Sequence, residues 1–76
     1  MDSPADPGIQ RHQLRLDQYR GLAREAELAA AACTLERVRE QHQAAAVSWT
    51  GLANAEVARI AERRARLDAA IRTEPT

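Results

Sequence analysis

Histidine and cysteine, the residues in this sequence best suited to bind metal ions, are few. His42 and Cys33 stand nine positions apart. His42 has no second potential ligand three or four residues away, the spacing that places two ligands on one helix face. His12 is isolated, and Cys33 is the only cysteine, so no intrachain disulfide can form. The sequence therefore predicts no metal site, and we interpret His42 as a polar residue in a helix interface in preference to a ligand or a pH switch.

Arginine is the other candidate for specific chemistry. Arg59, Arg63 and Arg66 share one face of a predicted helix, where they could contact phosphates or an acidic partner. The same segment has opposite charges four residues apart, which is typical of a solvated face, in the pairs Glu62–Arg66, Arg64–Asp68 and Asp68–Arg72. The 11 basic residues balance 11 acidic ones. Zero net charge gives no general attraction to nucleic acid or anionic lipid, so we predict no nucleic-acid partner.

Enzymatic motifs do not occur in the 76 residues. No serine, cysteine or aspartate stands in a nucleophile motif and no glycine-rich loop is present, so we predict neither catalysis nor a cofactor. No apolar run is long enough to span a membrane. The first eight residues lack the basic and apolar regions of a secretory signal. We therefore expect a cytoplasmic protein, with export without a cleavable signal peptide as the alternative.

Two helices and no strand are predicted, because both long segments show helical and not alternating periodicity. We place helix 1 at about 9–46, a turn at 47–51 and helix 2 at about 52–72, with tails at 1–8 and 73–76. Asp6 followed by Pro7 is a typical helix start. The expected fold is all-α, an antiparallel two-helix coiled-coil hairpin. The alternative is a three-helix bundle in which helix 1 breaks at Gly21, its only internal glycine.

The predicted interface between the helices repeats at alternating spacings of three and four residues. Its larger members are Leu28, Leu35, Val38, Val57, Ile60, Leu67 and Ile71. Because helix 1 is predicted to be the longer, its first half has no partner within the chain. That half contains an apolar strip that we expect to bind another helical chain, formed by Leu14, Leu16, Tyr19, Leu22 and Ala26.

The turn itself contains the only tryptophan. Trp49 lies two residues before Gly51, and a glycine accepts the positive φ that a tight reversal needs. Helix, Trp-x-Gly turn and helix together resemble the WXG (ESAT-type) family of small bacterial type VII secretion substrates. The resemblance covers residues 9–72 as architecture and 48–55 as sequence. It implies a hairpin that pairs with another hairpin in a four-helix bundle, leaves the cell folded and catalyses nothing, with Trp49 and Gly51 as the matched positions.

The chain also departs from that family. Its predicted second helix is shorter than the first, and its only tyrosine, Tyr19, cannot supply the Tyr-x-x-x-Asp/Glu export signal that follows helix 2 in one partner. The predicted function is thus a non-enzymatic hairpin that pairs with itself or a similar hairpin, as a type VII substrate or its partner. The alternative is a cytosolic coiled-coil adaptor or secretion chaperone.

Overall fold

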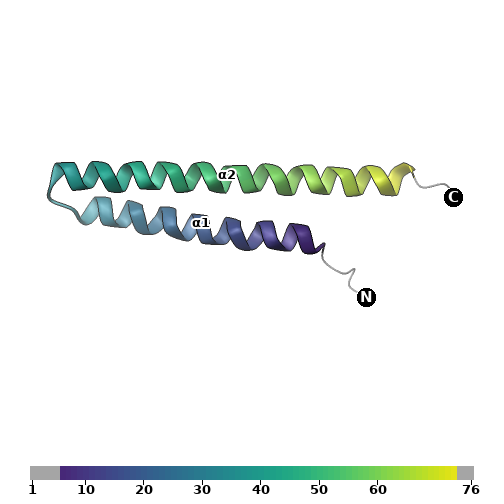
Figure 1. The fold of residues 1–76 in the computed structure, drawn as a ribbon, viewed down its shortest axis with the longest axis horizontal. Coiled ribbons are helices and arrows are strands. Elements are labelled where there is room, and N and C mark those ends of the chain that lie inside the picture. Colours follow the sequence, from purple (N-terminus) through teal and green to yellow (C-terminus); the bar gives the residue numbers. More distant parts are fainter. Residues whose placement is uncertain (1–5, 74–76) are drawn as a thin grey trace.

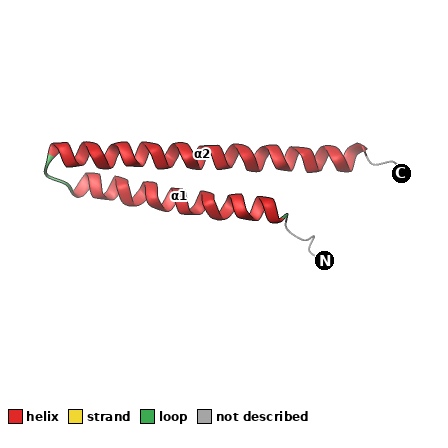
Figure 2. Cartoon of the chain, in the orientation of Figure 1, coloured by secondary structure: helices red, strands yellow, loops and turns green. Residues whose placement is uncertain are grey.

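The fold is an antiparallel hairpin of two helices, α1 (Pro7–Ala32) and α2 (Glu36–Thr73), joined by residues 33–35 (Figure 1). The computed structural model describes residues 6–73, and no strand occurs within them (Figure 2). The all-α hairpin is therefore confirmed. The predicted tails at 1–5 and 74–76 lie outside the described residues, whereas Pro7 and Gly8, predicted as tail, belong to α1.

The start of α1 is determined by Asp6 and Pro7. The Asp6 Oδ1 atom accepts hydrogen bonds from the backbone N–H groups of Gly8 at 2.8 Å and Ile9 at 3.2 Å. Pro7 occupies the first helical position, where its missing N–H group costs nothing. This is the helix start that the Asp6–Pro7 pair predicts.

The reversal between the helices lies at residues 33–35, so the predicted turn at 47–51 is wrong. Cys33 is extended, with φ −84° and ψ 131°, and its N–H group donates to the Ala30 carbonyl oxygen at 3.2 Å. The Arg39 guanidinium donates to the Cys33 carbonyl oxygen at 2.9 Å. No described residue has a positive φ, so this turn needs no glycine. Cysteine and threonine have lower helix propensity than the alanines before them, which makes Cys33-Thr34 the weak point of the chain.

Both internal glycines lie within helices. α1 continues through Gly21 without a break, so the three-helix alternative is wrong, and Gly51 lies in the middle of α2. A Cβ atom added at either glycine would meet nothing within 4 Å. The cost of about 1 kcal/mol for glycine in a helix is tolerated here because the flanking residues continue the helix on both sides.

Replacing Gly51 with alanine is therefore expected to stabilise the hairpin. The gain should be about 0.5–1 kcal/mol, because alanine restricts the unfolded chain and meets no neighbour in the folded one. Urea denaturation followed by circular dichroism measures this change. A clear loss of stability would instead place Gly51 in a turn.

The register of the two helices is constant along the interface. His12 contacts Glu56, and Tyr19, seven residues further along α1, contacts Trp49, seven residues back along α2. Most buried and half-buried positions of α1 follow the alternating three- and four-residue spacing of a coiled coil, and Cys33 continues it just after the helix. They are Ile9, His12, Leu16, Tyr19, Ala23, Ala26 and Ala30, while Gly8 and Ala29 are half-buried outside the pattern.

The core between the helices is thin. Its buried hydrophobic residues are Leu16, Ala23, Ala26, Ala30, Ala46, Ala53 and Ile60. The two large side chains lie toward the open end of the hairpin, where Leu16, Ala53 and Ile60 form one cluster with Ile9 and Tyr19 packed against it. In the half nearer the turn the buried residues are all alanines, so little apolar area stabilises that half.

α2 is the longer helix, contrary to prediction. Its 38 residues extend about 57 Å, against about 39 Å for the 26 residues of α1. Because Asp6, at the start of α1, lies beside Arg63, the last ten residues of α2 project beyond α1 (Figure 1). The segment that extends past the other helix is therefore the end of α2 and not the first half of helix 1.

Candidate functional site

The predicted interface residues are only partly where they were expected. Ile60 is buried and Val38 is half-buried, but the other five are exposed: Leu28, Leu35, Val57, Leu67 and Ile71. Leu28 and Leu35 are predicted to share one helix with Trp49, but Leu28 lies before the turn, Leu35 lies in it and Trp49 lies in α2. Because the turn lies at 33–35 and not at 47–51, different residues of the first helix face the second.

The predicted partner strip on α1 also changes role. Leu16 and Ala26 are buried within the chain, and the Tyr19 ring stacks on the Trp49 ring with centroids 5.9 Å apart and an interplanar angle of 22°. The strip thus has a partner in α2, and the expectation that it lies unpaired is wrong. Leu14 and Leu22 lie outside this contact and are exposed.

Trp49 and Gly51 do not form a turn unit. Trp49 is half-buried in the middle of α2, where it faces Tyr19 of α1. Gly51 is exposed on the same helix. The expectation that the tryptophan closes one end of the hairpin is therefore wrong, although the ring does pack between the helices.

A buried polar layer crosses the interface near its open end. Glu56 is only 1% exposed, and one carboxylate oxygen contacts His12 Nδ1 at 2.5 Å. The other oxygen accepts a hydrogen bond from Arg59 Nη1 at 2.8 Å. Burial by itself raises the pKa of Glu56, but the hydrogen bonds and charges of His12 and Arg59 outweigh it and hold the pKa below its ordinary value of 4.5. Both carboxylate oxygens are thereby satisfied within the core.

Sequence reasoning missed this layer. His12 was interpreted as isolated because its partner is 44 residues away. A signal was nevertheless present: His12 stands between Ile9 and Leu16, and Glu56 between Ala53 and Ile60, each at core spacing.

The polar layer predicts that the hairpin loses stability in acid. Because the pKa of Glu56 is lower in the folded chain than its ordinary value, the layer stabilises the fold above about pH 4.5. That stabilisation is lost as the pH falls through the folded-state pKa. We expect the urea midpoint to decrease below about pH 4.5, and to decrease less in Glu56→Gln, whose side chain does not titrate. A wild-type urea midpoint that does not change in this pH range would show that ionised Glu56 does not stabilise the fold.

A second ion pair joins the end of α1 to α2. Arg63 Nε donates to Asp6 Oδ1 at 2.8 Å. This hydrogen bond lowers the pKa of Asp6, against an opposing contribution from burial and with support from the backbone N–H groups of Ile9 and Gly8. Asp6 therefore caps α1 and also ties it to α2.

A groove, which we call the side groove, runs along one edge of the helix interface. Four cavities of about 650, 350, 250 and 260 Å³ follow one another along this edge, and each shares lining residues with the next. Glu27 lines the first three, and Arg20 joins the third to the fourth. The floor is apolar and consists of Leu16, Ala23, Ala30, Ala46, Ala53 and Ile60.

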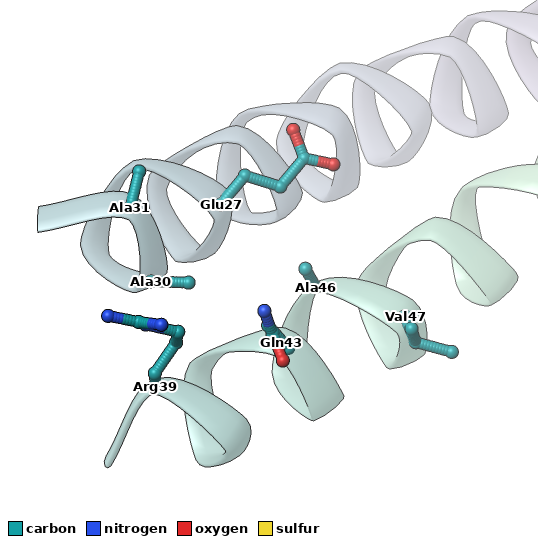
Figure 3. A pocket seen from close by; sticks show the side chains of 7 residues that line it. All are labelled: Glu27, Ala30, Ala31, Arg39, Gln43, Ala46 and Val47. Atoms are coloured by element: carbon teal, nitrogen blue, oxygen red, sulfur yellow. The ribbon is translucent and has the colours of Figure 1, made fainter. Parts of the chain in front are cut away.

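Figure 3 shows the part of the side groove nearest the turn. Ala30 and Ala46 point into the space between the helices, and the Glu27 carboxylate points away from α2. Val47 stands at the rim and is 73% exposed. The groove at this end therefore has an alanine floor, with Glu27 on its α1 side and the polar side chains of Arg39 and Gln43 on its α2 side.

Metal and membrane sites were also sought in the structure. Among residues 6–73, no group of three or more histidine, cysteine, aspartate or glutamate side chains could hold a metal ion. Neither of the described helices has a segment apolar enough, over a sufficient length, to cross a membrane.

Comparison with known proteins gives no family for this chain. No family model matches it, and no curated protein or solved structure matches it either.

Proposed function

We propose that this chain is a non-enzymatic association module, a helical hairpin that pairs with a second copy of itself through the side groove. The observation that supports the proposal is the groove itself. It is continuous, has an apolar floor and has exposed Val47 on its rim. Continuous apolar surface of this kind is typical of interaction sites.

The thin core gives the hairpin a reason to associate. Only Leu16 and Ile60 are large among its seven buried hydrophobic residues. Small domains with so little buried area usually gain stability by oligomerisation. Two hairpins packed face to face give a four-helix bundle, which would cover the alanine floor on both copies.

Charge on the groove rim favours a second copy as the occupant. Glu27 and Arg20 both line the groove from α1, two helical turns apart. Neither has an ion-pair partner among the described residues. If two copies pair antiparallel around a two-fold axis midway between these residues, each Glu27 faces Arg20 of the other copy. Each copy thus supplies a partner for Glu27 and for Arg20 of the other, while the other arginines that line the groove, Arg24, Arg39 and Arg64, gain no acidic partner from this pairing.

The same axis passes near Val47 of α2. The contact between Tyr19 and Trp49 shows which residues of the two antiparallel helices lie side by side. Counted from that contact, the α1 residues midway between positions 20 and 27 lie beside the α2 residues just before Val47. Val47 would then lie close to its own counterpart across the axis. A charge at this position would meet the same charge on the second copy across the axis.

Sedimentation equilibrium of Val47→Asp tests the proposal. Wild type should associate, and Val47→Asp should remain monomeric and helical, since the side chain is exposed in the single hairpin. Leu28→Asp is the matched control, because Leu28 is an exposed apolar residue that lines none of the groove cavities. A monomeric wild type, or dissociation by Leu28→Asp and not by Val47→Asp, would overturn the proposal.

Export through a type VII machine is a narrower prediction that depends on the Trp49-Thr50-Gly51 motif. The motif lies within α2 instead of at the turn, so its position departs from the family pattern. Thr50 and Gly51 do line the side groove, which associates the motif with the proposed contact surface. Appearance of the chain in culture medium, dependent on Trp49 and Gly51, is the test of export. Association with cytosolic partners alone would favour the adaptor alternative.

A further inference from the structure

We propose that the open end of the hairpin binds a phosphate group in a basic cavity. This cavity lies on the edge of the helix interface opposite the side groove and shares no lining residue with it. Its volume is about 430 Å³. It is lined by Pro7, Gly8, Arg11, His12, Arg15 and Arg63.

Three guanidinium groups from two helices meet at this cavity. Arg11 and Arg15 stand one turn apart on α1, and Arg63 comes from α2. No carboxylate lines the cavity. Arg63 is held by Asp6 through Nε, so its position is determined while its remaining N–H groups stay available as donors.

Gly8 makes room for this arrangement. A Cβ atom at position 8 would lie 2.6 Å from the central guanidinium carbon of Arg63. With a Cβ atom at this position, the flexible end of the Arg63 side chain would have to shift. The glycine thus lets Arg63 lie directly against the start of α1, on the cavity that Arg11 and Arg15 also line.

Two of the three positive charges at the cavity, those of Arg11 and Arg15, are not neutralised within the described chain, whereas Arg63 is paired with Asp6. Arg11 and Arg15 form no ion pair with any residue between 6 and 73. The nearby carboxylates are already engaged, Asp6 by Arg63 and Glu56 by His12 and Arg59. Like charges held together are unfavourable, and a bound anion would relieve that repulsion.

Phosphate is the anion that fits these donors. A phosphate dianion has several acceptor oxygens in a tetrahedral array, so it can accept from three guanidinium groups at once. A carboxylate is planar and carries a single charge, so it matches the total charge and the spread of three guanidinium groups less well than a phosphate dianion does. The backbone N–H groups of Gly8 and Ile9 donate to Asp6, so the arginine side chains and not the helix terminus would be the main donors.

Titration with inorganic phosphate, followed by the amide resonances of Gly8, Arg11 and Arg15, tests the site. Ionic strength is held constant with sodium chloride, because exposed charges respond to salt alone. We expect saturable shifts confined to the open end of the hairpin. A second titration uses glycerol phosphate in place of inorganic phosphate. Saturable binding of either ligand supports the proposal, and the tighter one shows whether the site takes the free ion or a phosphomonoester.

The variants Arg11→Gln/Arg15→Gln and Arg37→Gln make the test specific. Removing two of three guanidinium groups should weaken binding about tenfold or more, since each charge-assisted hydrogen bond contributes substantially. Arg37, exposed near the turn, lines no cavity and its variant should bind as wild type does. Shifts that do not saturate, or that persist unchanged in the double variant, would overturn the proposal. Val47→Asp should bind phosphate normally, which separates this site from self-association.

Discussion

Replacing Ile60 with aspartate is expected to unfold the hairpin. Ile60 is 6% exposed and lies in the cluster with Leu16 and Ala53. The substitution removes one of two large buried side chains and places a carboxylate in an apolar contact without a partner. The loss should exceed about 3 kcal/mol, which is a large part of the stability of a domain this small. Far-ultraviolet circular dichroism should show loss of most helical signal at room temperature.

Leu35→Asp is the matched control for that experiment. The sequence places Leu35 and Ile60 in one predicted interface, but Leu35 is 67% exposed in the turn. The same charge there should change the free energy of unfolding by less than about 0.5 kcal/mol. If both variants unfolded, the turn would lie elsewhere and the interface register described above would be wrong.

Replacing Trp49 with alanine should destabilise the hairpin by about 2–4 kcal/mol. The ring is half-buried, and its stack on Tyr19 contributes about 0.5–1.5 kcal/mol beyond the area that it buries. Urea denaturation of Trp49→Ala, Tyr19→Ala and the double variant gives the coupling between the two rings. Strictly additive losses would show that the rings do not interact. An undiminished stability of Trp49→Ala would place the ring outside the interface.

The ends of the fold were more predictable than its middle. Asp6-Pro7 marks the beginning of α1 because capping is local and depends on adjacent residues. The turn was not predictable in the same way. Gly51 has strong turn propensity but lies within the continuous helix α2, whereas Cys33-Thr34-Leu35 reverses the chain without any glycine.

Alanine explains why the interface register was misread. The true interface of α1 near the turn is Ala23, Ala26 and Ala30, whose methyl groups give a weak hydrophobic pattern. Leu28 and Leu35 give a stronger pattern but lie on the exposed side. Small side chains let the two helices approach closely, so the less hydrophobic face is the one that packs.

The polar contacts could not have been found from local patterns. His12 and Glu56 meet only because the helices pair in one particular register, and the same is true of Arg63 and Asp6. The side groove has the same origin, since its two walls come from different helices. Ion pairs and grooves of this kind depend on the tertiary arrangement, which the spacing of residues within one helix does not contain.

A charge-reversal experiment tests pairing through the side groove most directly. In an antiparallel pair of copies, Glu27→Arg places arginine opposite Arg20, and Arg20→Glu places glutamate opposite Glu27. Each variant alone should self-associate about tenfold more weakly or worse, because like charges then face each other twice in the complex. Glu25→Arg makes the same charge change at an exposed α1 position that lines none of the cavities and should have no effect.

The decisive measurement is sedimentation equilibrium of an equimolar mixture of Glu27→Arg and Arg20→Glu. Every facing pair in the mixed complex has opposite charges, so two variants that each fail to self-associate should form a one-to-one heterodimer of wild-type affinity. Two monomers that do not recombine, or single variants that associate as wild type does, would contradict pairing through this groove.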